Sequence, residues 1–178
     1  MRGIWLRSWR MVLGLSAGFL LLAGPASADW EWLSIHGHSG QIQNPSGVSG
    51  GPTEGGLKFT LKDLSTSVHF AVPSRSQSYT TSTATAAQWK VRYLRLKFWT
   101  GSSDACITKI HVWDGDLLLK EINYSSDKSW YGLQDLTIDL GKKWRILRAL
   151  GVSVEVSRGV ESMNHDFAFY SVGARWEK

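Results

Sequence analysis

The sequence contains 178 residues, with 20 Lys and Arg against 15 Asp and Glu, one cysteine and a formal net charge of +5. A chain of this length forms a sizeable hydrophobic core in a single domain, and a single cysteine excludes an internal disulfide. The basic residues are scattered instead of gathered in a tract, which argues against a nucleic-acid-binding protein.

The first 28 residues have the features of an export signal. Three arginines and no acid precede the apolar run Met11–Ala23, and the small residues Ala26–Ala28 follow it. This order predicts cleavage before Asp29, and the run is shorter than the roughly 20 residues of a membrane-spanning helix. We therefore expect a secreted protein, periplasmic or extracellular, with no stable membrane anchor and one domain over 29–178. The signal takes three of the 20 basic residues and none of the 15 acidic ones, so the mature chain has a net charge of 17 − 15 = +2.

Alternation of apolar and polar residues predicts β-strands through the first half of the mature chain. The segments with this period are 30–36, 39–44, 57–62 and 66–72. The Gly- and Pro-rich stretch 45–56 is expected to be a turn region, and the Ser- and Thr-rich stretch 74–88 is expected to be a surface loop.

The segment 89–99 predicts a strand with an interruption. Its apolar residues have odd numbers up to Tyr93 and even numbers from Leu94 to Phe98. A phase slip of this kind is typical of a β-bulge, which we expect at Tyr93–Leu94. The alternative is that both faces of the strand are buried there.

The segment 105–124 predicts a hairpin, because Asp-Gly at 114–115 is a strong turn signal. A two-residue turn would place Val112 opposite Leu117 and Lys109 opposite Lys120, and a three-residue turn is the alternative. Cys106 lies in the first strand of this hairpin, where a free cysteine is expected to be a small buried hydrophobic residue.

The remaining strands are expected at 135–140, 152–156 and 167–176, with turn signals between them. Only 142–150 has the apolar spacing of a short helical turn. About nine strands without βαβ spacing indicate an all-β fold, namely an antiparallel β-sandwich or a jelly-roll-like domain with at most one short helix.

No familiar catalytic signature occurs in the sequence. A Gly-x-Ser-x-Gly elbow, a His-Glu-x-x-His pair and a phosphate-binding glycine loop followed by lysine are all absent. We therefore name no catalytic residue and expect no cofactor. A hydrolase that uses an Asp/Glu pair is the alternative, since such a pair is defined by its separation in space.

Two sets of residues are candidates for a metal site, the histidines for zinc and the carboxylates of Asp104, Asp114 and Asp116 for calcium. His36 and His38 would point to one face of a continuous strand, and with His69 from another strand they could bind zinc. Hydrogen bonding within the chain is the simpler interpretation, and turn chemistry explains the carboxylates of Asp114 and Asp116. No metal site is therefore expected.

The aromatic residues point more clearly to binding, since eight tryptophans lie in the mature chain. Trp99, Trp113 and Trp130, with the neighbouring Tyr131, border predicted loops. An aromatic ring at a loop end can stack on a sugar or contact a protein partner. These four residues are our ligand-binding candidates, and the alternative is that they cap the ends of the core.

Several stretches carry a resemblance to a known family. They are Ile35–Gly37, Gln41–Gln43, Val68–Pro73, Leu96–Ala105, Ile110–Gly115 and Gly151–Val154. In these stretches the chain resembles an uncharacterised family of secreted β-sandwich domains of unknown function. The resemblance implies a sandwich fold and export, and it implies no catalytic residue. The sequence departs from the family after Val72, where a longer Pro-rich run is usual.

These observations favour a secreted, non-catalytic binding module for a glycan or a protein ligand. The alternatives are an extracellular polymer hydrolase with an Asp/Glu pair and a structural protein that assembles at surfaces through its sheet edges. The pattern does not specify an oligomeric state.

Overall fold

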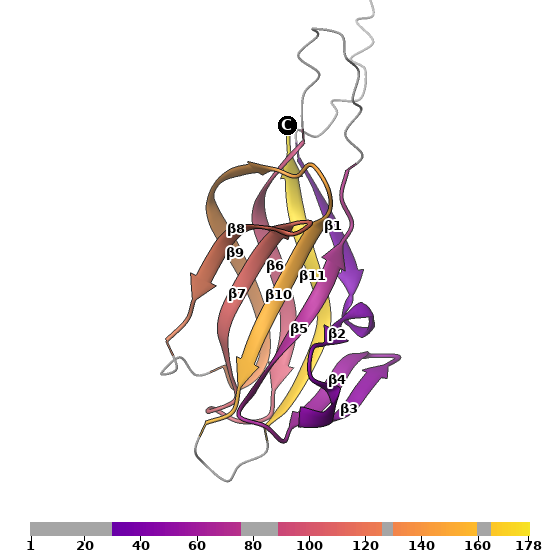
Figure 1. Ribbon diagram of the computed structural model, residues 1–178, viewed down its shortest axis with the longest axis vertical. Coiled ribbons are helices and arrows are strands. Elements are labelled where there is room, and N and C mark those ends of the chain that lie inside the picture. Colours follow the sequence, from indigo (N-terminus) through magenta and orange to yellow (C-terminus); the bar gives the residue numbers. More distant parts are fainter. Residues whose placement is uncertain (1–29, 76–88, 126–129, 160–164) are drawn as a thin grey trace, which may run out of the picture.

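The computed structural model describes residues 30–75, 89–125, 130–159 and 165–178. Within these ranges the chain forms two antiparallel sheets that face each other (Figure 1). There are eleven strands and two short 3₁₀ turns, η1 at Gly37–Ser39 and η2 at Pro45–Gly47. The prediction of an all-β antiparallel sandwich is confirmed.

The two sheets interleave segments from the whole described chain. The six-stranded sheet has the order β3-β4-β11-β6-β9, and β1 pairs with another part of β11. Its strands are β1 (Trp30–His36), β3 (Val48–Thr53), β4 (Gly56–Leu61), β6 (Lys90–Thr100), β9 (Gly132–Arg145) and β11 (Asp166–Glu177). The five-stranded sheet has the order β2-β5-β10-β7-β8. Its strands are β2 (Gln41–Ile42), β5 (Ser65–Val72), β7 (Cys106–Asp114), β8 (Leu117–Asn123) and β10 (Leu150–Ser157).

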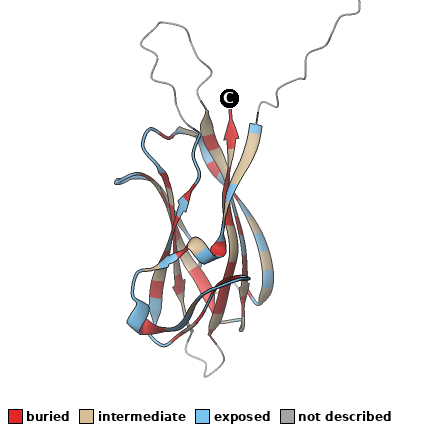
Figure 2. Cartoon of the chain, turned by 90° about the vertical axis from the view of Figure 1, so that its right-hand side faces the viewer, coloured by how far each residue is buried: buried red, intermediate tan, exposed pale blue. Residues whose placement is uncertain are grey.

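The core lies between the sheets and consists of the inward-facing residues of each strand. Figure 2 shows buried residues alternating with exposed ones along the strands, as the period of two predicts. Aromatic rings fill the centre, where Phe169 lies 6.1 Å from Phe98 and 5.5 Å from Phe70 between ring centroids. Cys106 is a free, buried cysteine as expected.

The phase slip predicted in β6 is present, one residue before its expected position. In the pairing of β6 with β9 the register shifts between Val91 and Tyr93, so the bulge lies at Arg92. Gly141 in β9 faces this irregularity with a φ of +81°, a backbone region that favours glycine. The bulge therefore depends on both strands, and the partner strand could not be identified from the 89–99 segment.

The hairpin of β7 and β8 forms with a register different from the predicted one. Asp114 pairs with Leu117, so the turn residues are Gly115 and Asp116, and the expected pairing of Val112 with Leu117 is wrong. The cause is that Asp114 ends β7 as a buried residue. Its carboxylate accepts hydrogen bonds from the backbone N–H groups of residues 147 and 148, at 2.8 and 2.6 Å.

A second shift in β8 changes the expected charge contacts of this hairpin. Val112 lies opposite Lys120, and Lys109 lies opposite Asn123. The like-charge pair of Lys109 with Lys120 is therefore avoided. Lys109 instead lies 3.9 Å from the carboxylate of Glu121.

Two further expectations are corrected by the structure. The stretch 45–56 contains η2 and the edge strand β3, in which Pro52 is tolerated because an edge strand leaves some N–H groups unpaired. The stretch 142–150 forms no helix, since β9 continues to Arg145. Residues 1–28 and most of 74–88 lie outside the described residues. Among the described residues, no helix is long and apolar enough to cross a bilayer.

Candidate ligand-binding surface

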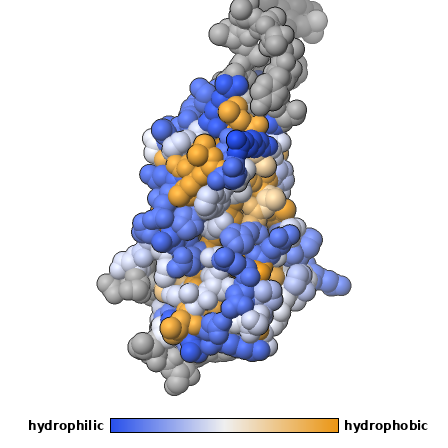
Figure 3. Space-filling model, in the orientation of Figure 1, coloured by the Kyte–Doolittle hydropathy of each residue, from blue (hydrophilic) through white to orange (hydrophobic). Residues whose placement is uncertain are grey.

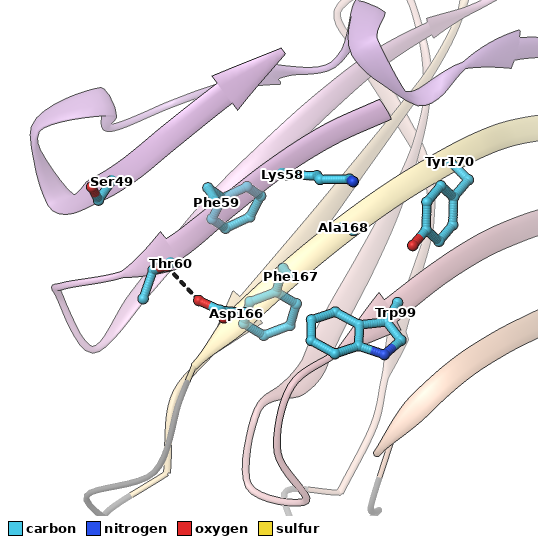
Figure 4. A pocket seen from close by; sticks show the side chains of 9 residues that line it. All are labelled: Ser49, Lys58, Phe59, Thr60, Trp99, Asp166, Phe167, Ala168 and Tyr170. Atoms are coloured by element: carbon cyan, nitrogen blue, oxygen red, sulfur yellow. Dashed lines mark hydrogen bonds between the residues drawn. The ribbon is translucent and has the colours of Figure 1, made fainter. Parts of the chain in front are cut away.

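The outer face of the six-stranded sheet carries a row of side chains across four strands. Lys58 of β4 lies opposite Ala168 of β11, Ala168 lies opposite Trp99 of β6, and Trp99 lies opposite Leu133 of β9. Directly opposed residues point to the same face of a sheet. Ala168 is the smallest member of the row, so the sheet is hollowed between Lys58 and Trp99 (Figure 4).

Three adjoining hollows form a groove along this face, which we name the sheet-face groove. The first has a volume of about 420 Å³ and is lined by Ser49, Lys58, Phe59, Thr60, Trp99, Asp166, Phe167, Ala168 and Tyr170. The second has a volume of about 460 Å³ and is lined by His36, Gly55, Lys97, Trp99, Leu133 and Tyr170. The third, of about 270 Å³, shares Lys97 with the second. Trp99 and Tyr170 therefore lie where the first two hollows meet.

Tyr170 reaches the groove from an irregular position in β11. The pairing of β11 with β6 passes from Phe169 directly to Ser171, so Tyr170 is the extra residue. It is half-buried, and Figure 4 shows its ring on the same side of the sheet as Trp99. Sequence reasoning did not name Tyr170. The signal was present in the sequence, because the large apolar residues change from odd numbers at Phe167 and Phe169 to even numbers at Val172 and Trp176.

The charged residues of the groove fall into two groups. Arg95 and Asp135 form a two-point ion pair, with N···O distances of 2.7 and 2.5 Å. This hydrogen bond from Arg95 holds the pKa of Asp135 below its usual range. Asp166 accepts a hydrogen bond from the hydroxyl of Thr60.

Lys58 and Lys97 form the second group, and neither lies within ion-pair distance of a carboxylate in the described part of the chain. Lys97 lies directly opposite Asp135 in the pairing of β6 with β9, and its charge adds to that of Arg95 in lowering the pKa of Asp135. Among the described residues, Lys58 thus has no carboxylate partner and Lys97 shares Asp135 with Arg95, so the positive charges exceed the negative ones in this part of the groove.

The carboxylates of the groove do not have the separation of a glycosidase pair. From the pairing register, the backbones of Asp135 and Asp166 are about 16 Å apart, given the usual strand spacing and rise. Glycosidases hold their two carboxyl groups about 5 to 9.5 Å apart. A general acid also needs a raised pKa, and that of Asp135 is lowered. The arrangement of charged groups in this groove therefore suits the binding of a ligand better than glycoside hydrolysis.

The four aromatic candidates from the sequence occupy three different places. Trp99 is half-buried at the centre of the groove. Tyr131 is 67% exposed and immediately precedes β9, two residues before the groove residue Leu133. Trp113 lies in β7 of the other sheet, where its indole N–H donates to the hydroxyl of Ser153 at 3.0 Å.

Trp130 corrects the expectation of a surface aromatic, since it is only 3% exposed. Its ring packs edge-on against Phe98 and Tyr124, each at 5.5 Å between centroids. Its backbone carbonyl accepts a hydrogen bond from the hydroxyl of Thr100 at 2.7 Å. Trp130 thus caps the end of the core, which was the alternative interpretation for these residues.

The three histidines considered for a metal are not brought together. The Nδ1 atoms of His36 and His38 are 2.7 Å apart, whereas His69 bonds to Ser153 on the five-stranded sheet through its own Nδ1, also at 2.7 Å. Within the described ranges, no three His, Cys, Asp or Glu side chains form a group that could hold a metal ion.

Comparison with known proteins gives no family for this chain. No family model matches it, and no curated protein matches it. The solved structures similar to it include the C-terminal CBM6 of LamC, a laminarinase from Zobellia galactanivorans, with 11% identity, 83% of this chain and 100% of that chain covered, and a TM-score of 0.48. A family 35 carbohydrate-binding module from Clostridium thermocellum has 10% identity, covers 80% and 97%, and has a TM-score of 0.44. These identities and TM-scores are too low to assign a ligand to this chain.

Proposed function

We propose that this chain is an exported, non-catalytic module, folded from residues 29–178, that binds a polysaccharide along the sheet-face groove. The observation that carries the proposal is the place of Trp99. Its ring is half-buried in the middle of a four-strand row, beside the small Ala168, and it borders both of the larger hollows.

The chemistry of the groove suits a sugar. A pyranose ring has an apolar face of C–H groups and a rim of hydroxyls, so it binds where a flat aromatic ring lies beside polar donors and acceptors. Trp99 and Tyr170 supply the aromatic surface. Lys58 and the Thr60–Asp166 pair line the same hollow and supply the polar groups (Figure 4).

The length of the groove favours a polymer over a single sugar. The three hollows extend from Thr60 and Asp166, past Trp99, to Arg95 and Asp135. Strand spacing and rise make this path about 16 Å long. A linear glycan could therefore contact the aromatic centre and both polar ends at once.

Binding to a panel of soluble polysaccharides, followed by isothermal titration with the best of them, tests the proposal. We expect Trp99→Ala to weaken binding at least about tenfold, because a central aromatic contact of this kind is worth about 2 kcal/mol. Tyr170→Ala should also weaken it. Trp113→Ala is the matched control, since it removes the same ring from the opposite sheet and should leave the affinity unchanged.

Two results would contradict this assignment. One is the absence of binding to every polysaccharide in the panel by a folded protein. The other is a glycan affinity that falls on Trp113→Ala and is indifferent to Trp99→Ala, which would move the site to the five-stranded sheet.

A further inference from the structure

We infer that the ligand of the sheet-face groove is an acidic polysaccharide, with anionic groups on its sugars that pair with Lys58 and Lys97. This inference rests on the proposed glycan-binding function and specifies its ligand class. It is carried by two ammonium groups that flank the aromatic centre and lie outside ion-pair distance of every carboxylate in the described residues.

Lys58 lies on one side of the aromatic centre. It belongs to the same row as Trp99, with only Ala168 between them. Figure 4 shows its side chain extending toward Tyr170 and away from the Thr60–Asp166 pair. It is exposed, so its ammonium group is available to a ligand in the first hollow.

Lys97 lies on the other side, two residues before Trp99 in β6 and opposite Ser171. It lines the second and third hollows. From the register, the backbones of Lys58 and Lys97 are about 12 Å apart, given the usual strand spacing and rise. Their long side chains can therefore reach separate anionic groups along one bound chain.

The other charged groups of the groove do not cancel these two. Asp135 forms an ion pair with Arg95 and also faces Lys97, so these three residues together keep one net positive charge. Asp166 is the remaining carboxylate that lines a hollow, and it lies at the far end from Lys97, bonded to Thr60. His36 lines the second hollow beside Lys97. The groove is thus basic around Trp99 and Tyr170.

This positive charge is a local feature of the groove. The mature chain is expected to carry a net charge of only +2, and general attraction of polyanions would therefore be small. An ammonium group pairs with carboxylate and sulfate alike, as a compact point charge with three donors. The shared chemistry is a sugar-borne anion, and the experiment distinguishes these two sources.

The test compares polymers that differ only in charge. The purified protein is titrated with polygalacturonate and with the same polymer after full methyl esterification, and in parallel with dextran sulfate and dextran. We expect the charged member of at least one pair to bind at least tenfold more tightly than its neutral form. The preference should shrink as salt rises from about 50 to 500 mM, because exposed charges are screened.

Variants then assign the preference to the two lysines. Lys58→Gln and Lys97→Gln should each weaken binding of the preferred polyanion about threefold, the value of a partly exposed ion pair. They should weaken binding of the neutral polymer less than that of the polyanion, because glutamine keeps a hydrogen-bond donor but loses the charge. Lys120→Gln on the five-stranded sheet is the control for the loss of one positive charge, and it should change neither.

The outcomes separate the inference from the function on which it rests. If neutral and charged polymers bind equally and Trp99→Ala abolishes both, the groove binds glycans and the acidic specificity is wrong. If the lysine variants and Lys120→Gln weaken polyanion binding equally, the attraction is a general charge effect and the inference fails. If no polymer binds, the proposed function fails as well.

Discussion

The outer faces of the two sheets carry similar residues but differ in how the polar groups around them are bonded. Each face carries a half-buried tryptophan with polar neighbours, Trp99 on the six-stranded sheet and Trp113 on the five-stranded sheet. On the five-stranded face the polar atoms bond to one another. On the six-stranded face the aromatic centre lies in a groove beside two lysines that form no ion pair with a carboxylate of the described residues.

The network on the five-stranded face is centred on Ser153. Its hydroxyl lies 2.7 Å from Nδ1 of His69 and 3.0 Å from the indole nitrogen of Trp113. In the same row His111 contacts Glu121 at 3.0 Å. Figure 3 shows this side of the molecule, where hydrophobic patches are broken up by hydrophilic residues.

Trp113 and Trp99 look alike in the sequence, but the two faces give them different surroundings. The indole N–H of Trp113 is already used by its own sheet, and the ring lies over Gly151 of the neighbouring strand, where an added Cβ would meet ring atoms at 3.8 and 3.9 Å. Trp113 therefore acts as part of the sheet. Trp99 has a hollow on either side, and we propose it as the platform for a ligand.

The largest expected effect comes from filling the groove. Ala168→Leu places a larger side chain between Lys58 and Trp99, and we expect ligand affinity to fall at least tenfold, about 1.4 kcal/mol. The free energy of unfolding should also fall, by about 1 to 3 kcal/mol, because Ala168 is only 3% exposed and the larger side chain must displace its neighbours. Titration calorimetry and urea denaturation measure the two quantities.

The same substitution on the other face provides the control. Ala71 lies across Gly151 from Trp113 in the five-stranded sheet. Ala71→Leu should leave the affinity within a factor of two. Equal losses for the two variants would show that the two faces do not differ in function.

A smaller effect is expected from the network around Ser153. Ser153→Ala removes the partner of both His69 and Trp113, and should lower the free energy of unfolding by about 1 kcal/mol while leaving ligand affinity unchanged. Ser171→Ala, on the outer face of the six-stranded sheet, is the comparison variant and should change stability by less than about 0.5 kcal/mol. A Ser153→Ala protein as stable as the parent would mean that the network does not hold this face.

The smallest expected effect is a pH dependence that belongs to the five-stranded face. Partial desolvation, and then the charge of nearby His111, lower the pKa of His69 below its ordinary value of 6.5. The unfolded chain therefore binds a proton more readily, so this contribution to stability is present above pH 6.5 and is lost as the pH falls through the folded pKa. His69→Gln should reduce the change of melting temperature with pH between about pH 7.5 and pH 5.5.

A separate acid window is expected from the paired carboxylates. Hydrogen bonds lower the pKa of Glu121 and of Asp135 in the folded protein. The stability that these two carboxylates contribute is therefore present above their unfolded pKa values and is lost as the pH falls through their folded pKa values. His69→Gln should leave this lower window intact. A parent protein with no change in melting temperature between pH 7.5 and 5.5 would contradict the assignment for His69.

Much of the fold was predictable because alternation is a local property. The strand at 30–36 was predicted with the bounds of β1, and the phase slip in 89–99 indicated a real bulge. The hairpin register was wrong because Asp114 bonds to backbone N–H groups about 33 residues later in the chain. The edge strand β3 was missed because its Gly and Pro residues resemble a turn.

The site was only partly predictable from the sequence. The chain alone indicated an all-β fold, a buried cysteine and aromatics near loop ends, because period and composition act over a few residues. Only the tertiary structure separated Trp99 from Trp113 and Trp130, and only it joined Tyr170, Lys58 and Lys97 to Trp99. The physical reason is that strands far apart in the chain pair in the sheet, and this pairing determines which side chains share a face.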